Sequence, residues 1–299
     1  MSDTPLGRFC WNELMTTDPA AARDFYASIT GWGTSIWDGG EKPYEMWMNG
    51  EMPVGGLMDL PAPDVPPCWL TYLSTPDLDE TMEKVKASGG TVMNELAVPQ
   101  VGRFAVIADP QGGVISILEP EGETPGHDGP PALAEFSWRE LATTDADAAW
   151  AFYAGVFGWE DAGRMDMGEM GPYQVFGRGG QPRGGIFNGP PEMRAVGWLL
   201  YVRVPDVHQA AERVRELGGK VLNGPMEVPG NDYIAQCMDP QGIAFAVHQA
   251  AEAAADGQAD GPPAAGSRAT RCAAGVGWRV PRSLSGARPV AERVSRPAS

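Results

Sequence analysis

Residues 9–32 read FCWNELMTTDPAAARDFYASITGW, and residues 136–159 read FSWRELATTDADAAWAFYAGVFGW. The second stretch repeats much of the first at a constant distance of 127 residues, so that Trp11 recurs as Trp138 and Glu13 as Glu140. A period this long exceeds the 20 to 50 residues of a solenoid repeat. The duplication therefore predicts two homologous domains in tandem.

The first copy also predicts the order of its secondary structure. Residues 8–17 alternate between two sets of side chains, as a strand does. Asp18 and Pro19 then provide an N-cap and a first helical residue, which predicts a helix over 20–29 that ends at Gly31. Turn residues separate three short β-rich segments that follow. These segments cover residues 32–36, 44–49 and 54–60, and they complete a βαβββ module.

The same order follows at once in residues 69–119, where the helix is expected over 78–88. This second module also returns downstream, because Trp69-Leu70 matches Trp198-Leu199 and the turn DPQG at 109–112 recurs at 239–242. The chain is thus predicted to be an α+β protein of two domains, each containing two βαβββ modules. We expect the domains at 1–120 and 134–250, a Pro/Gly-rich linker at 121–133, and a disordered tail at 251–299, whose composition lacks periodicity.

Composition limits the choice of partners. The formal net charge of −17 and the pI near 4.5 argue against nucleic acid and anionic membranes, which are bound by basic surfaces. The N-terminus has no apolar signal segment and no apolar run approaches the roughly 18 residues of a membrane span, so we expect a cytoplasmic protein. The four cysteines are scattered without a CxxC motif, which indicates neither a zinc cage nor a disulfide framework.

A strand and helix with FY followed by GW, paired βαβββ modules, and a DPxG turn before the last strand together resemble the vicinal oxygen chelate superfamily. That superfamily includes glyoxalase I, extradiol dioxygenases and bleomycin-resistance proteins, and the resemblance covers residues 8–249. It implies a strongly curved sheet around a cleft in each domain. It also implies a divalent ion held by His, Gln or Glu, although one fold hosts many activities.

The metal-ligand positions that the resemblance implies carry unsuitable side chains. Indole and leucine do not bind divalent ions, and the remaining sets, Glu13 with Asp59 and Glu140 with His248, fall short of three or four ligands. We therefore predict no cofactor, with a divalent metal as the alternative. The implied positions are Trp11, Asp59, Leu70 and Ser116 in domain 1, and Trp138, Asn188, Leu199 and Ala246 in domain 2.

Strand alternation predicts which side chains face the cleft. Aromatic rings with few polar groups suit a planar apolar ligand, with or without a cationic group. A carboxylate in such surroundings has a raised pKa, so Glu13 and Glu140 are candidate general acids or bases. Besides the two glutamates, the candidate ligand-binding residues from alternation are Trp11, Leu70, Tyr72, Ser116, Trp138, Leu199, Tyr201 and His248. Tyr44 and Tyr173, each after a proline, are further candidates at the rim of the cleft, and Asp59 is a candidate that the resemblance implies.

Three functions remain open from the sequence. The first is a metal-independent protein that binds an apolar or aromatic small molecule for sequestration or resistance. The second is an enzyme, either a glyoxalase-like lyase or a hydroxylase or dioxygenase acting on a reactive carbonyl or an aromatic polyketide through Glu13 or Glu140. The third is a structural or scaffolding homodimer in which the clefts are vestigial.

The pairs Gly55-Gly56 and Gly184-Gly185 are expected in turns or bulges.

Overall fold

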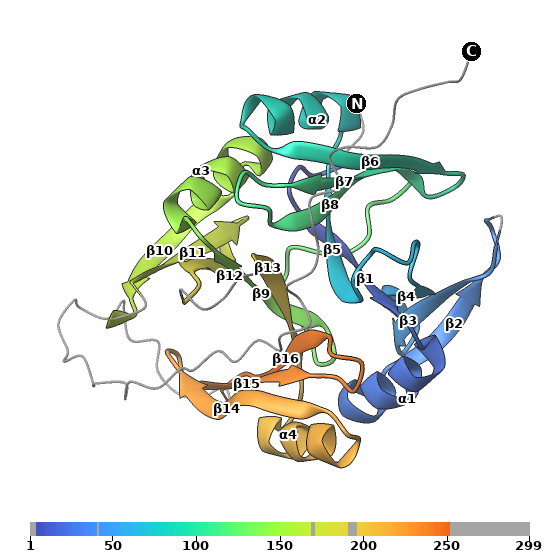
Figure 1. Cartoon of the computed structure of the whole chain (residues 1–299), viewed down its shortest axis with the longest axis vertical. Coiled ribbons are helices and arrows are strands. Elements are labelled where there is room, and N and C mark those ends of the chain that lie inside the picture. Colours follow the sequence, from blue (N-terminus) through green and yellow to red (C-terminus); the bar gives the residue numbers. More distant parts are fainter. Residues whose placement is uncertain (1–3, 41, 169–170, 191–195, 252–299) are drawn as a thin grey trace.

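The computed structural model describes residues 4–40, 42–168, 171–190 and 196–251. It confirms the two tandem domains and their βαβββ modules (Figure 1). The tail expected to be disordered lies, apart from residue 251, outside the described residues. Among the helices described, none has the length and apolar character that crossing a membrane requires.

Each domain is built on one eight-stranded sheet. In domain 1 the order is β2-β3-β4-β1-β5-β8-β7-β6, and in domain 2 it is β10-β11-β12-β9-β13-β16-β15-β14. The strands of domain 1 are β1 (Phe9–Thr16), β2 (Gly33–Trp37), β3 (Tyr44–Asn49), β4 (Met52–Asp59), β5 (Cys68–Ser74), β6 (Thr91–Val98), β7 (Gly102–Ala108) and β8 (Val114–Pro120). Those of domain 2 are β9 (Phe136–Thr143), β10 (Glu160–Asp166), β11 (Pro172–Arg178), β12 (Gln181–Asn188), β13 (Gly197–Arg203), β14 (Lys220–Val228), β15 (Asp232–Met238) and β16 (Ala244–Gln249).

The helices start and stop where the sequence predicts. The helix α1 (Pro19–Thr30) is capped by the Asp18 side chain, which accepts a hydrogen bond from the Ala21 N–H, and it ends at Gly31 with φ of 78°. Glycine adopts this left-handed conformation without the steric cost that a Cβ imposes. The other three helices, each with an aspartate N-cap, are α2 (Leu78–Ala87), α3 (Ala146–Phe157) and α4 (Val207–Glu216).

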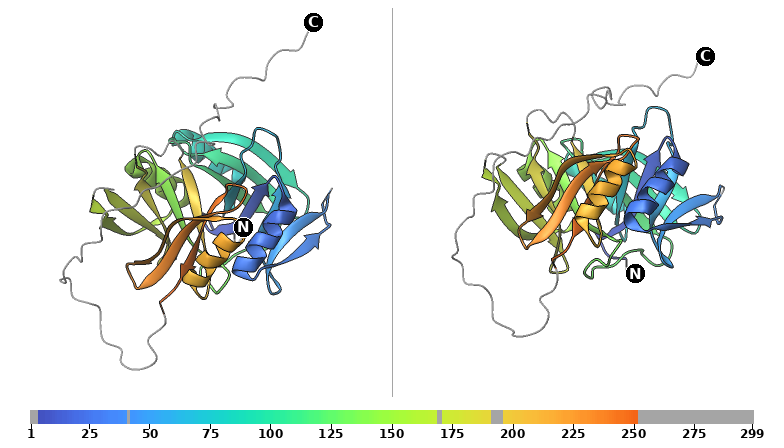
Figure 2. Two further views of the ribbon diagram at one scale, coloured as in Figure 1. Left: turned by 60° about the horizontal axis from the view of Figure 1, so that its bottom comes forward. Right: turned by 90° about the horizontal axis from the view of Figure 1, so that it is seen from below.

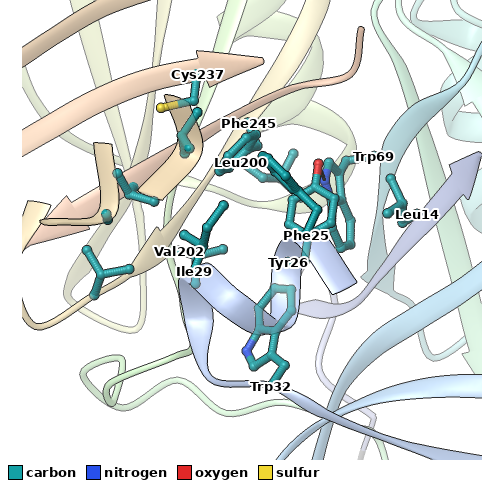
Figure 3. Close-up of a cluster of buried hydrophobic side chains, with 14 of the residues drawn as sticks. Leu14, Phe25, Tyr26, Ile29, Trp32, Trp69, Leu200, Val202, Cys237 and Phe245 are labelled. Carbon is teal, nitrogen blue, oxygen red and sulfur yellow. Dashed lines mark hydrogen bonds between the residues drawn. The ribbon is translucent and has the colours of Figure 1, made fainter. Parts of the chain in front are cut away.

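The two domains share their hydrophobic cores. One core combines α1 and the first module of domain 1 with α4 and the second module of domain 2, and a second core combines the other two modules. Figure 1 accordingly shows α1 beside α4 and α2 near α3, and Figure 2 shows the same α1–α4 pair from two further sides. In Figure 3, Phe25 and Tyr26 of α1 meet Phe245 of β16. Burial of this apolar surface holds the domains together.

The recurrent motifs of the sequence make these interdomain contacts twice. The tyrosine of each FY pair reaches the DPQG turn of the other domain, since the Tyr26 hydroxyl donates to Asp239 at 3.2 Å and the Tyr153 hydroxyl donates to Asp109 at 3.0 Å. The indole N–H of Trp32 likewise donates to the Ala134 carbonyl at 2.7 Å. These motifs therefore serve the packing of one domain on the other.

The linker is fixed to both domains. Asp128 accepts two hydrogen bonds from the Arg8 guanidinium of domain 1, at 3.0 and 2.9 Å, and pairs with Arg178 of domain 2. The neighbouring Gly129 carbonyl accepts from Arg183 at 3.0 Å. These ion pairs are partly buried, and their guanidinium groups lower the pKa of Asp128 although burial opposes this shift. The linker thus adds charged contacts to the interdomain packing.

Candidate functional site

The face of the domain 1 sheet that the helices leave uncovered gathers most of the predicted site residues. Strand β1 pairs with β5 so that Trp11 lies opposite Tyr72 and Glu13 lies opposite Leu70. Strand β8 pairs with β5 so that Ser116 lies beside Tyr72. Paired residues project from the same face of a sheet, so these side chains form one patch across three central strands.

A chain of hydrogen bonds joins four of these side chains around the Glu13 carboxylate. The Tyr44 hydroxyl donates to Glu13 Oε1 at 2.6 Å, and the Tyr72 hydroxyl donates to Glu13 Oε2 at 2.8 Å. The Trp11 Nε1–H donates to the Tyr44 oxygen at 3.0 Å. We call Trp11, Glu13, Tyr44 and Tyr72 the domain 1 network. Each carboxylate oxygen has a phenolic donor, which satisfies a charge that would otherwise be costly to bury.

A glycine that the sequence analysis placed in a turn or bulge makes room for this network. Gly56 lies in β4, paired with Glu13, and a Cβ built on it would lie 1.7 Å from the Tyr44 hydroxyl oxygen. The bulge in β4 lies at Val54, directly before Gly55, and Gly55 and Gly56 themselves continue the paired strand. The missing side chain of Gly56 lets the Tyr44 ring cross β4 to reach Glu13.

Domain 2 repeats the arrangement. The Tyr173 hydroxyl donates to Glu140 Oε1 at 2.8 Å, and the Tyr201 hydroxyl donates to Glu140 Oε2 at 2.5 Å. The Trp138 Nε1–H donates to the Tyr173 oxygen at 2.9 Å. These four residues form the domain 2 network, in which Leu199 lies opposite Glu140. Gly185 takes the place of Gly56, because a Cβ there would lie 1.9 Å from Cζ of Tyr173.

The two networks differ in their neighbours. In domain 2 the buried Gln236 of β15 donates through Nε2 to the Tyr201 oxygen at 2.9 Å and lies 3.4 Å from Glu140 Oε2. Gln236 pairs with Ala246, whereas the corresponding pair in domain 1 is Val106 with Ser116. No sequence motif drew attention to Gln236, because β15 carries no metal-ligand position of the resemblance.

Burial determines the proton affinity of both networks. Desolvation raises the pKa of Glu13 above its ordinary value, although the hydrogen bonds from Tyr44 and Tyr72 act in the opposite direction. Desolvation likewise raises the pKa of Glu140 against three hydrogen bonds. The tyrosine pKa values also rise well above 10, chiefly through burial, so the phenols stay protonated as donors. Each carboxyl group can therefore take up a proton closer to neutrality than a solvated glutamate.

Three candidate positions lie apart from the networks. Asp59 is exposed at the end of β4 and pairs with Thr16, whose hydroxyl contacts Gln241 of domain 2. Asp59 therefore belongs to the helix-covered face of the sheet, opposite the face that carries the network. Asn188 is its counterpart, and its side chain accepts from the Ala146 N–H at the start of α3. The expected grouping of Asp59 with Glu13 is therefore wrong. His248 lies on the register of Ala246, but its ring nitrogens lie 2.9 Å from Ser137 and 2.9 Å from Asp232.

These donors do not fit a divalent metal. The two carboxylate oxygens of Glu13 and of Glu140 already accept phenolic hydrogen bonds, and the adjoining positions carry indole and leucine side chains. Within the described part of the chain, no three His, Cys, Asp or Glu side chains come together as a ligand set. Metal independence itself stays a prediction.

A cavity of about 370 Å³ lies elsewhere, between the end of α1 and the length of α4. Its lining includes Ile29 from domain 1 and Asp206, Glu212, Arg213 and Glu216 from domain 2. This polar, open site lies at the junction of the domains, where the helices pack, and it does not adjoin either network. Its lining does not match the planar apolar ligand that the sequence predicts.

The family model described as Glyoxalase/Bleomycin resistance protein/Dioxygenase superfamily matches residues 8–117 and 135–247, one match in each domain. The chain belongs to this superfamily. Two superfamily relatives are similar over most of their length. The anthracycline biosynthesis protein DauV of Streptomyces sp. is 30% identical over 275 residues, which cover 84% of this chain and 97% of DauV. DnrV of Streptomyces peucetius, also named as an anthracycline biosynthesis protein, is 30% identical over 262 residues, covering 81% and 92%.

A third relative matches only in part. The glyoxylase-named protein CFP32 of Mycobacterium tuberculosis is 41% identical over 116 residues, covering 38% of this chain and 44% of CFP32. Among solved structures, the Mn(II)-bound glyoxalase from Novosphingobium aromaticivorans superimposes with a TM-score of 0.57 at 16% identity, covering 82% of this chain and 83% of that one. The 2,3-dioxygenase LapB from Pseudomonas sp. gives 0.59 at 11% identity, covering 82% and 93%. At these identities the structures show a shared fold alone, and they carry no information about the reaction.

Proposed function

We propose that this superfamily member binds a planar aromatic small molecule without a metal, on the helix-free face of one or both sheets. The observation that carries the proposal is the Trp–Tyr–Glu–Tyr network, built twice across the central strands. Such a patch offers flat apolar area with one polar centre, the composition of many small-molecule sites. An aromatic ligand can stack on the half-buried indoles of Trp11 and Trp138 while a polar substituent meets the network.

The relatives narrow the ligand class. DauV and DnrV are named for anthracycline biosynthesis, and the match to DauV extends over nearly its whole length. We therefore propose a polycyclic aromatic ligand that carries hydroxyl and quinone groups. Such a molecule combines a flat apolar ring system with donors and acceptors at its edge, which matches the chemistry of the networks. Binding of this kind serves sequestration, or delivery of an intermediate.

The test uses chelator-treated full-length protein. We expect 1,8-dihydroxyanthraquinone to quench tryptophan fluorescence saturably and to raise the melting temperature, since a ligand of the native state stabilises it. We expect Trp11→Ala and Trp138→Ala to keep the fold. Whichever of the two changes a domain that binds the ligand should weaken binding about tenfold. The matched control is Tyr233→Phe, which removes only an exposed hydroxyl that donates to Glu227.

Metal titration gives the opposing outcome. Zinc, nickel, cobalt, manganese and iron are expected to leave the melting temperature of the stripped protein unchanged. A clear stabilisation by one of these ions, together with lactoylglutathione formation or oxygen uptake, would contradict the metal-free proposal. Wild-type affinity for the anthraquinone in both tryptophan variants would assign the indoles to the core instead.

An enzymatic function is the second candidate, and the raised pKa of Glu13 and of Glu140 favours it. A carboxyl group that titrates nearer neutrality is suited to accept a proton from a bound hydroxyl or an acidic C–H group and to return it. This candidate requires turnover of a carbonyl or polyketide substrate that Glu13→Gln or Glu140→Gln abolishes.

Four further expectations stay predictions. They are the cytoplasmic location, the exclusion of nucleic acid and membrane partners, the homodimer and the exact domain boundaries.

A further inference from the structure

The Tyr44 phenol links Glu13 and Trp11 in the domain 1 network through two hydrogen bonds that a phenolic ligand can also make. We infer that domain 1 is the ligand-binding domain and that a phenolic hydroxyl of the ligand takes the place of the Tyr44 hydroxyl between Glu13 and Trp11. The inference rests on the proposed binding of an aromatic molecule. It adds the domain, the functional group that is recognised, and the side chain that the ligand displaces.

The geometry around Tyr44 defines a receptor for a phenol. Its hydroxyl donates to Glu13 Oε1 at 2.6 Å and accepts from Trp11 Nε1 at 3.0 Å, so both hydrogen-bonding roles of a phenol are used. Its ring crosses the strand at Gly56, where a Cβ would lie 2.5 Å from the ring carbon that carries the hydroxyl. The strand thus leaves flat space for a ring, with an acceptor and a donor placed on its hydroxyl.

Exchange of one phenol for another conserves these hydrogen bonds. If Tyr44 rotates away, Glu13 loses one of its two phenolic donors and the Trp11 N–H loses its acceptor. A buried carboxylate and a buried N–H without partners are costly, so an aromatic ring that lacks a hydroxyl gains little by entering. A phenolic ligand restores both bonds, and the site therefore discriminates phenols from their methyl ethers.

Domain 2 holds the equivalent phenol more firmly. Tyr173 is buried and its ring is stacked on Phe187, with centroids 5.8 Å apart and planes at 17°. The register equivalent of Phe187 in domain 1 is Met58, and Tyr44 is only half-buried. Gln236 further ties Tyr201 and Glu140 together in domain 2. Displacement of Tyr44 therefore costs less than displacement of Tyr173, which assigns the ligand to domain 1.

The first experiment uses the wild-type chain in isothermal titration calorimetry, with 2,6-dihydroxyanthraquinone, whose hydroxyls are free of internal hydrogen bonds, and its dimethyl ether as probes. We expect the ether to bind at least tenfold more weakly, and Glu13→Gln to lose at least tenfold in affinity for the dihydroxy compound. Glu227→Gln, a surface change on β14, serves as the matched control. Equal binding of both probes would overturn the inference and leave aromatic binding intact. The inference would also be overturned if Glu140→Gln lost affinity for the dihydroxy compound while Glu13→Gln kept the affinity of the wild type.

A second experiment removes the internal phenol. Tyr44→Gly creates a space that p-cresol, the side chain of tyrosine as a free molecule, should fill and stabilise, whereas 4-methylanisole should not. Tyr173→Gly is the matched variant in domain 2. Cresol that raises the melting temperature of Tyr173→Gly and not that of Tyr44→Gly would overturn the assignment to domain 1. If the glycine variants do not fold, the wild-type titration decides alone, and absence of any anthraquinone binding there contradicts the proposed function as well.

Discussion

Domain 1 and domain 2 carry the same Trp–Tyr–Glu–Tyr network, but different residues support it. In domain 2 the outer tyrosine stacks on Phe187 and Gln236 adds a further donor, whereas domain 1 has Met58 and Val106 at those positions. The duplicated chain has thus kept the residues that build the network and varied the residues that fix it in place. Two copies of one site can thus differ in the contacts that support them without any change in their central groups.

The largest expected effect comes from filling the two glycine sites. Gly185→Ala forces its Cβ onto Tyr173, which is stacked on Phe187. Gly56→Ala forces its Cβ onto Tyr44, for which the described residues show no stacked ring. We expect losses of about 1–3 kcal/mol in the free energy of unfolding, with Gly185→Ala the more costly of the two. Urea denaturation measures both.

The control for this pair is Gly155→Ala in α3. A Cβ at Gly155 meets no atom within 4 Å, so this variant should gain about 0.5–1 kcal/mol from helix propensity. Equal losses at Gly56 and Gly185 would show that Tyr44 and Tyr173 are equally fixed, and the two domains would then not differ in this respect.

The next effect is a pH dependence that Glu13 and Glu140 share. Burial raises both pKa values in the folded state above the ordinary value of 4.5. The folded protein therefore keeps protons that the unfolded chain has lost, and stability falls as pH rises from about 4.5 through the folded pKa. Relative to Glu13→Gln or Glu140→Gln, the wild type should lose stability over that range by up to about 1.4 kcal/mol per pH unit for each group.

Chemical denaturation of the wild type and both variants at a series of pH values measures this dependence. Subtracting each variant from the wild type removes the contributions of other titrating groups, such as Asp239 and Asp128. If the free energy of unfolding of the wild type rose relative to the variants with increasing pH, the phenolic hydrogen bonds would lower the folded pKa more than desolvation raises it.

The smallest effect tests the residue that separates the networks. Gln236→Val gives domain 2 the side chain that β7 carries at Val106, and it removes the hydrogen bond to Tyr201. We expect a loss of about 0.5–1.5 kcal/mol, the net value of a typical hydrogen bond. The difference between the domains would be supported if Gln236→Val also allowed 2,6-dihydroxyanthraquinone to bind domain 2 of the Glu13→Gln variant, and it would be contradicted if the substitution changed neither property.

Much of the fold could be predicted from the sequence because its signals are local and occur twice. The Asp18 cap, the Gly31 stop and the strand at residues 8–17 each reflect the conformational preference of a few neighbouring residues, and the structure reproduces them within one or two residues. Alternation along β1 likewise placed Trp11 and Glu13 on one face. The position that the resemblance implied at Asp59 was wrong, because Gly56 pairs with Glu13 and Asp59, three residues further along β4, therefore lies on the opposite face.

The sequence by itself determined the duplicated modules, the superfamily resemblance and the side chains of the central strands, because periodicity and capping act between residues close in the chain. Only the tertiary structure decided that Tyr26 meets Asp239, that Tyr44 passes over Gly56 to reach Glu13, and that Gln236 joins Glu140. These contacts join residues separated by 31 to 213 positions. Their formation depends on sheet register and on the packing of two domains, which no local pattern encodes.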